Sequence, residues 1–155
     1  RDSELPGADI VISMVIDCIE SRQDPNQLSK TAFSDLFDSF AESSACRWII
    51  AGYPHRDDER IAAAIAELLA DCAHRVEQPL RLLLAMQGRA PRPKITMAQI
   101  AQMVVSMFLG LAVRAQVNRA GVTKLVEFDG EQWPLVALGA NALVSRCSEP
   151  LDGNS

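Results

Sequence analysis

The chain lacks the sequence patterns that mark the common catalytic and metal-binding sites. Its 155 residues contain no Gly-x-Ser-x-Gly, P-loop, Gly-x-Gly-x-x-Gly or His-Glu-x-x-His motif. Asp71 and His74 have the i, i+3 spacing of two metal ligands, but a di-metal helical bundle needs a second such pair and further carboxylates. His55 is expected in a loop and His74 on a solvent-exposed stripe. We therefore expect no enzyme activity, no metal and no cofactor.

An excess of positive charge is also missing. The chain has a net charge of -5 at pH 7 and an isoelectric point of about 5.0, whereas binding to a phosphate backbone needs a concentrated basic surface. We therefore expect no nucleic-acid binding by this chain alone. No secretory signal peptide is recognisable, and the sequence begins at Arg1 rather than Met, from which we expect a fragment or a processed product.

Cysteines are few and dispersed. Cys18, Cys46, Cys72 and Cys147 form no Cys-x-x-Cys or Cys/His ligand pattern. With 48% hydrophobic and 23% charged residues the chain has the composition of an ordinary globular domain, which needs no disulfide to fold. We therefore expect reduced thiols and a cytoplasmic protein. A thiol sensor stays conceivable through Cys18 or Cys72, although both lie on apolar helix faces, where the thiolate is disfavoured.

Apolar residues at helical spacing are abundant. One segment has them at i, i+3, i+4 and i+7, which predicts an amphipathic helix: Phe33, Leu36, Phe37 and Phe40. The same analysis, with turn residues as boundaries, predicts helical segments over 8–23, 29–43, 45–55, 57–87, 96–116 and 131–147. No strand pattern or repeat competes. The sequence therefore predicts one all-α domain of about six helices over residues 1–147 and a polar tail over 148–155.

The segment 96–116 is apolar on nearly every face. A membrane span needs about 20 apolar residues, whereas the uninterrupted run here, 103–113, contains Ser106 and has polar flanks. We therefore expect protein on both sides of this helix and no membrane. The final helix has the same excess, and its small residues permit close helix approach.

These two helices predict a dimer. Two such helices from each of two chains would form a four-helix bundle across a two-fold axis. The residues expected at this interface are Val104, Phe108, Leu111, Ala115, Leu135, Leu138 and Ala142. The alternative is a monomer in which 96–116 is a central core helix.

Three segments carry a resemblance to a known family. MAQIAQMVVSMFLGLAVRAQ (97–116), VEFDGEQWPLVALGANALV (126–144) and AESSACRWIIAGYPHRDDERIAAAIAELL (41–69) are similar, in that order, to the penultimate helix, the final helix with its Phe-Asp-x-x-x-Trp lead-in, and the short and long helices that precede them. These helices belong to the C-terminal regulatory region of the tetracycline-repressor (TetR) family of transcriptional regulators, which the chain resembles over residues 10–146. Members of that family begin with a helix-turn-helix DNA-binding domain, which nothing here matches. The resemblance therefore implies a repressor whose DNA binding resides in an N-terminal domain absent from this chain.

The resemblance also implies an apolar effector pocket among the first, second, long and penultimate helices. The matching residues are Met14, Cys18, Phe33, Phe37, Trp48, Cys72, Val76, Met103 and Met107. Methionine and aromatic walls suit a hydrophobic or amphipathic small molecule, and Pro79, inside the long helix, predicts a kink that leaves room for one. The alternative is that these residues fill a core and that the chain is an all-α protein-interaction module without a small-molecule ligand.

Overall fold

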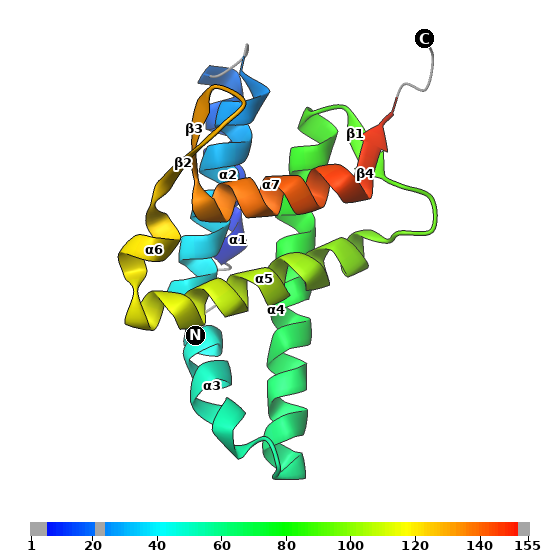
Figure 1. The fold of residues 1–155 in the computed structure, drawn as a ribbon. Coiled ribbons are helices and arrows are strands. Elements are labelled where there is room, and N and C mark those ends of the chain that lie inside the picture. Colours follow the sequence, from blue (N-terminus) through cyan, green and yellow to red (C-terminus); the bar gives the residue numbers. More distant parts are fainter. Residues whose placement is uncertain (1–5, 21–23, 152–155) are drawn as a thin grey trace.

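The computed structural model describes residues 6–20 and 24–151, which form an all-α domain (Figure 1). It is 78% helical with seven α-helices, which confirms the prediction of an all-α fold of about six helices. The helices are α1 (Pro6–Glu20), α2 (Pro25–Glu42), α3 (Ser44–Gly52), α4 (Glu59–Met86), α5 (Met97–Val117), α6 (Arg119–Thr123) and α7 (Leu135–Cys147), with a 3-10 turn, η1 (Tyr53–His55), after α3. Short strands are β1 (Arg89–Pro91), β2 (Leu125–Phe128), β3 (Glu131–Pro134) and β4 (Ser148–Pro150).

The helix starts are encoded locally. Asp24 precedes α2, and its side chain accepts hydrogen bonds from the backbone N–H groups of the first turn, where proline at the first helical position needs no donor. Asp58 caps α4 in the same way. At α5, Thr96 and Gln99 bind each other's backbone N–H groups in a reciprocal capping box. These caps explain why the boundaries predicted for the two longest helices lie within two residues of those observed.

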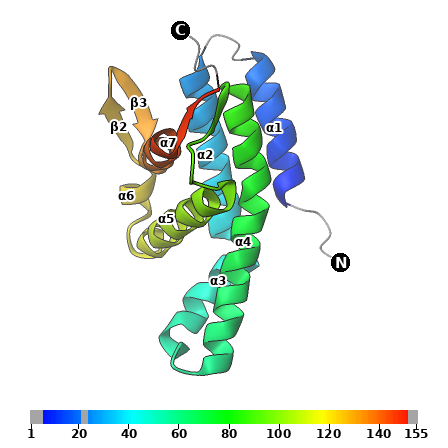
Figure 2. The same cartoon turned by 90° about the vertical axis from the view of Figure 1, so that its right-hand side faces the viewer.

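The main body of the domain has three layers. Figure 2 shows α2 and the C-terminal half of α4 side by side in the middle, with α1 on one side and α5 and α7 on the other. α5 and α7 run antiparallel to each other as an outer layer across α4 and α2 (Figure 1). α3 and the N-terminal half of α4 extend beyond these layers as a two-helix arm. α4 continues through Pro79 as one helix.

The hydrophobic core lies where α2, α4 and α5 meet. Phe108 of α5 is fully buried, and its ring lies 5.5 Å from that of Phe37 at 72° and 6.3 Å from that of Phe40. Edge-to-face contacts of this kind add to the free energy gained by burying the rings. From α4, Leu80 and Leu83 complete the centre of the core.

Two short β-ribbons correct the expectation that no strand is present. β2 and β3 form an antiparallel hairpin whose turn residues, Asp129 and Gly130, both have positive φ (51° and 77°). Asp-Gly is the preferred pair for such a tight turn. The segment expected to begin the last helix at 131 is therefore a strand, and α7 begins at Leu135.

The second ribbon joins β1 to β4 and involves the predicted polar tail. Arg89 donates hydrogen bonds to the Ser148 hydroxyl (3.0 Å) and to the carbonyl oxygens of Ser145 (3.1 Å) and Ser148 (2.9 Å). Ser148 is fully buried. The expected boundary at 147 is therefore wrong, because residues 148–150 pair with the body of the domain.

α5 is longer than the apolar run used to exclude a membrane span. It has 21 residues and a mean hydropathy of 1.6, so by length and composition it is sufficient to cross a membrane, and the argument from shortness is wrong. In the fold its inner face is covered by protein, with Ile100, Val104 and Phe108 fully buried, and its outer face is exposed. The core helix of a soluble protein can have the same length and composition, and the absence of a membrane stays a prediction.

Candidate functional site

The residues predicted to line one effector pocket are distributed over several parts of the structure. Met14, Phe33, Phe37, Cys72 and Val76 are buried in the common core. Trp48, in the arm, is 70% exposed, and Met103, on the outer face of α5, is 39% exposed. Met107 is half-buried beside α7, and the side chain of Cys18 lies outside the described part of the chain. In the single chain these residues therefore lie in the core, in the arm and on the outer face of α5, and a common cavity lined by all of them stays a prediction.

The residues predicted to line the effector pocket border different hollows of the structure. Cys72 and Val76 line a small hollow of about 60 Å³ beside Pro79, between α4, α1 and α2. Trp48 borders an open apolar groove of about 800 Å³ between α3 and the N-terminal half of α4. Phe37 lines a third hollow, of about 260 Å³, between α2, α3, α5 and α6. The third lies in the body of the domain against α5 and has both apolar and charged side chains in its lining. We take it as the candidate site and call it the α2–α5 pocket.

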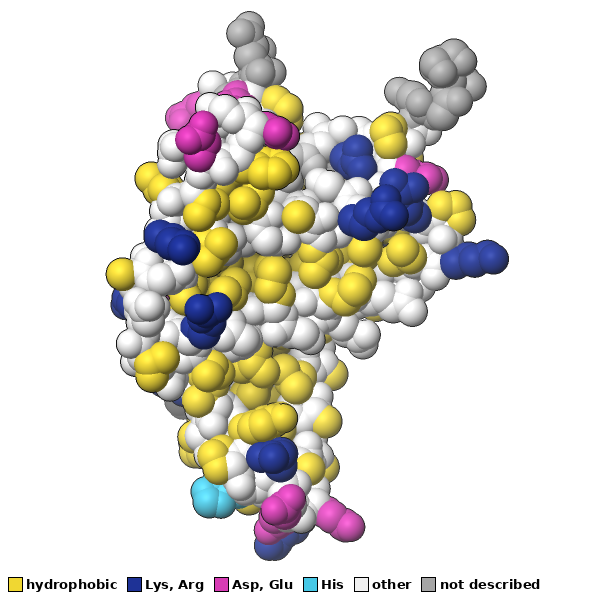
Figure 3. Space-filling model, viewed as in Figure 1, with side chains coloured by type: hydrophobic (Ala, Val, Ile, Leu, Met, Phe, Trp, Pro, Cys, Tyr) yellow, Lys and Arg dark blue, Asp and Glu magenta, His cyan; other side chains and the backbone are white. Residues whose placement is uncertain are grey.

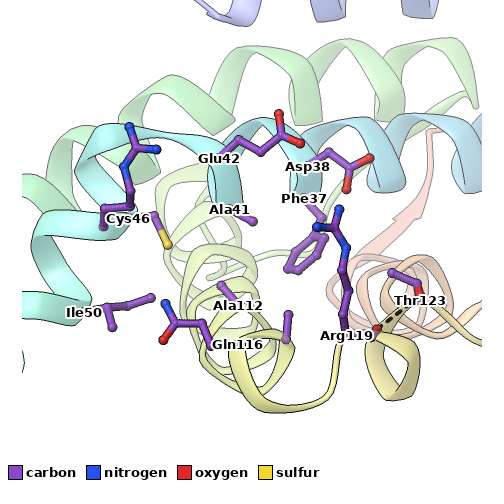
Figure 4. A pocket seen from close by; sticks show the side chains of 12 residues that line it. Phe37, Asp38, Ala41, Glu42, Cys46, Ile50, Ala112, Gln116, Arg119 and Thr123 are labelled. Atoms are coloured by element: carbon purple, nitrogen blue, oxygen red, sulfur yellow. Dashed lines mark hydrogen bonds between the residues drawn. The ribbon is translucent and has the colours of Figure 1, made fainter.

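The α2–α5 pocket has an apolar interior and a polar rim (Figure 4). The interior is formed by Phe37, Ala41, Cys46, Ile50, Ala112 and Ala115, and the rim by Asp38, Glu42, Arg47, Gln116, Arg119 and Thr123. The hollow exists because α5 presents alanines where larger side chains would fill the space against α2.

Helix periodicity places the two kinds of side chain next to each other. Phe37 and Ala41 are four residues apart on α2, and so are Asp38 and Glu42, so an apolar and an acidic stripe run in parallel along one side of the pocket. At the end of α2, the Ser43 hydroxyl accepts a hydrogen bond from the backbone N–H of Cys46 (3.1 Å) and so caps the start of α3. This turn directs the Cys46 sulfur toward the interior (Figure 4).

The rim of the pocket carries two carboxylates, Asp38 and Glu42, and two guanidinium groups, Arg47 and Arg119. Burial raises the pKa of Asp38, and the neighbouring Glu42 carboxylate raises it further, while Arg119 lowers it. Burial also raises the pKa of the Cys46 thiol, so the sulfur is protonated at neutral pH and is a poor nucleophile. The site can therefore bind a molecule through shape and charge, and it offers no activated group for covalent chemistry.

The residues predicted at a dimer interface divide into two groups. Val104 and Phe108 are fully buried in the chain's own core, so their assignment to an interface is wrong. On α5, Leu111 and Ala115 are half-buried. On α7, Leu135 and Leu138 are half-buried and Ala142 is exposed.

The outer layer nevertheless presents an apolar surface. Figure 3 shows hydrophobic side chains gathered along α7 and between α7 and α5. We call this surface the α5–α7 face and define it by Met103, Met107, Gly110, Leu111, Leu135, Leu138, Gly139 and Ala142, all at least partly exposed. A Cβ atom on Gly139 would lie 3.2 Å from the Met107 sulfur, so the glycine permits close packing of the two helices. Gly110 points into open space.

Metal and thiol chemistry receive no support from the described residues. No group of three or more His, Cys, Asp and Glu side chains suited to a metal ion occurs among residues 6–20 and 24–151. His74 is exposed on α4, as expected, and His55 is exposed beside the arm groove. Cys46, Cys72 and Cys147 are free thiols.

Sequence reasoning found Phe37 but missed the rest of the α2–α5 pocket. The parallel spacing of Phe37–Ala41 and Asp38–Glu42 was a usable indication of an amphipathic wall. Nothing in the sequence showed that Arg119 would face it, because that depends on the turn between α5 and α6. Comparison of the chain with protein-family models, curated proteins and solved structures finds no match.

Proposed function

We propose that this chain is the dimerisation and effector-sensing domain of a TetR-like transcriptional regulator, with DNA binding assigned to a separate N-terminal domain. One observation carries the proposal: α5 and α7 form an antiparallel pair on the outside of the domain, and their free face is apolar (Figures 1 and 3). Two copies of such a pair, related by a two-fold axis, make a four-helix bundle.

The size of the α5–α7 face is compatible with a stable dimer. At a rise of 1.5 Å per residue, helices of 21 and 13 residues are about 30 Å and about 20 Å long, and each is about 10 Å wide. The face therefore covers roughly 500 Å² per chain, or roughly 1,000 Å² for the pair, which is about the lower limit of specific interfaces. Gly110 supports the same assignment, because a glycine within a helix costs stability and nothing in the chain itself occupies the space beside it.

The sensing part of the proposal rests on the α2–α5 pocket. Its apolar interior and polar rim suit a small amphipathic molecule. It also lies against α5, the helix that contributes to the proposed dimer face.

A substitution on the α5–α7 face tests the proposal. Ala142 is exposed in the single chain, so Ala142→Glu should leave the fold intact while placing two carboxylates close to the two-fold axis of the dimer. The matched control is Ala66→Glu, because Ala66 is an exposed alanine of α4 in the two-helix arm. In sedimentation equilibrium we expect dimers for the wild type and the control and monomers for Ala142→Glu. A wild-type chain that remains monomeric at high micromolar concentration would contradict the proposal.

A second candidate function has one specific observation in its favour. Trp48 is 70% exposed next to the apolar arm groove, an arrangement suited to a protein partner. In a protein-interaction module of this kind, Trp48→Ala would weaken binding of the protein partner, and small molecules would not change the melting temperature. Ligand-induced stabilisation distinguishes the two functions, because a molecule that binds only the folded state raises the melting temperature.

A further inference from the structure

The charges around the α2–α5 pocket come from different elements: two carboxylates on α2, and two guanidinium groups, Arg47 on α3 and Arg119 on α6. Asp38 and Glu42 stand on adjacent turns of α2 along one side, and Arg119 faces them from α6 (Figure 4). Gln116, at the end of α5, supplies an amide beside Ala112 (Figure 4). A positive group would therefore find two carboxylates on α2, and a neutral oxygen acceptor would find donors on Arg119 and Gln116.

We infer that the α2–α5 pocket binds a small organic amine, with its ammonium group between Asp38 and Glu42 and its apolar body over Phe37 and Ala112 toward Cys46. The inference rests on the proposed sensing function only in identifying this amine as the effector. Binding itself is a property of the pocket and is testable alone.

The volume sets the size of the molecule. An apolar cavity of about 150 Å³ is sufficient for benzene, and this pocket offers about 260 Å³. It therefore has room for an aromatic or branched aliphatic body together with a short aminoalkyl chain.

The two carboxylates on α2 favour binding of the ammonium group of the ligand. Like charges four residues apart on a helix destabilise it, and here that repulsion, together with burial, raises the pKa of Asp38. An ammonium group placed between the carboxylates removes the repulsion and satisfies both oxygens with charged hydrogen bonds.

Cys46 closes the inner end of the pocket. Its side chain is only 1% exposed, and its sulfur points into the hollow (Figure 4). Because burial keeps the thiol protonated, it contacts the apolar body of the ligand without reacting with it. The same position makes Cys46 a chemical reporter of what enters the pocket.

Charged thiol reagents measure the preference of the pocket directly. Aminoethyl methanethiosulfonate is cationic and sulfonatoethyl methanethiosulfonate is anionic. In both, the thiolate attacks the sulfenyl sulfur, a disulfide forms, methanesulfinate leaves, and the thiol proton goes to solvent. Peptide mass spectrometry gives the rate at Cys46, and mercaptoethanol gives the intrinsic rate of each reagent. We expect each of the two carboxylates to favour the cationic reagent at Cys46 on the order of threefold, the range of exposed ion pairs, while Arg47 and Arg119 act in the opposite sense.

Matched double variants assign this preference to the two carboxylates. Asp38→Asn with Glu42→Gln should reduce the ratio of the cationic to the anionic rate to below that of mercaptoethanol, because Arg47 and Arg119 remain in the lining. The control, Glu67→Gln with Asp71→Asn, removes an identically spaced carboxylate pair from α4 and should leave the ratio unchanged. A ratio of rates that is the same for the wild type and for Asp38→Asn with Glu42→Gln, or a Cys46 that no reagent reaches in the native protein, would overturn the inference.

Ligand protection supplies the second measurement. Phenethylamine, phenethyl alcohol and phenylacetate share one apolar body and differ in charge. We expect phenethylamine to slow the reaction of Cys46 with neutral methyl methanethiosulfonate at lower concentration than the alcohol, and phenylacetate to protect least. Ala41→Phe and Ala112→Leu fill the pocket from opposite walls, and either folded variant should lose the protection.

The outcomes separate this inference from the proposed function. Protection that does not depend on ligand charge overturns the amine assignment. If the wild type still dimerises, and another molecule raises its melting temperature without protecting Cys46, the sensing function stands and the site lies elsewhere. A monomeric wild type that binds phenethylamine at Cys46 leaves the pocket assignment intact and refutes the dimeric regulator.

Discussion

The first prediction concerns Phe108 of α5, whose side chain could pack either in the core of its own chain or against a partner. In the structure its side chain is fully buried within one chain, in contact with Phe37 and Phe40 of α2. Truncating a buried Phe to Ala costs about 3–5 kcal/mol of stability, and the edge-to-face contact with Phe37 at 5.5 Å places the expected loss toward the upper end of that range. Because domains have only about 5–15 kcal/mol of stability in total, Phe108→Ala should remove a large part of it.

The assay is urea denaturation, with Val113→Ala as the control. Val113 lies on the same helix but is 47% exposed, so its truncation should change the free energy of unfolding by less than about 0.5 kcal/mol. Phe108→Leu supplies a milder variant whose dimerisation can be measured, and it should sediment like the wild type. A Phe108→Leu protein with wild-type stability that is monomeric would refute the placement of Phe108 in the core and restore it to the interface.

Two further predictions concern local features. Thr96→Ala removes one half of the capping box at the start of α5 and should lower the free energy of unfolding by about 1 kcal/mol in urea denaturation; an unchanged midpoint would show that the box contributes nothing. Burial raises the pKa of Asp35, and the carboxylates of Asp17 and Asp38 raise it further. The folded state therefore holds the Asp35 proton to higher pH than the unfolded state does. As the pH rises from the ordinary pKa of an aspartate through the raised pKa of Asp35, this group lowers the free energy of unfolding. Asp35→Asn should reduce that loss of stability between pH 4 and pH 7 in thermal denaturation, and a steeper loss in the variant would contradict the assignment.

The helices could be predicted from the sequence because their periodicity and caps are local. The amphipathic spacing around Phe33 and Phe37 indicated α2, and the apolar segment 96–116 indicated α5. The hairpin was missed because Asp129-Gly130 was interpreted as the lead-in to a helix, although the pair is also a strong turn signal.

The inward face of α5 could not be predicted for a physical reason. A helix that is apolar almost all round contains no polar stripe to show which side meets solvent. Val104 and Phe108 were therefore assigned to a partner and Met103 to the interior, whereas packing against α2 and α4 decides the reverse. The pocket was missed because its rim joins residues of α2 and α6 that are far apart in the sequence.

α5 connects the proposed effector site to the proposed dimer face. Ala112 and Ala115 line the α2–α5 pocket, while Met107 and Gly110 of the same helix belong to the α5–α7 face. A molecule that displaces α5 from α2 would move both surfaces together, and it would alter dimerisation only if it binds monomer and dimer with different affinities.

The last prediction is therefore a coupling between phenethylamine and dimerisation. Each chain has one pocket, so if dimerisation changes the affinity for the amine by some factor, saturating amine must change the dimer dissociation constant by the square of that factor. Sedimentation equilibrium with and without amine gives the change in the dimer dissociation constant, and protection of Cys46 at low and high protein concentration gives the change in affinity. We expect both to change, and both to return to the ligand-free behaviour when Asp38→Asn and Glu42→Gln are combined. An amine that protects Cys46 equally at all protein concentrations would show that the pocket and the interface are independent, because equal affinity for the two states shifts no equilibrium.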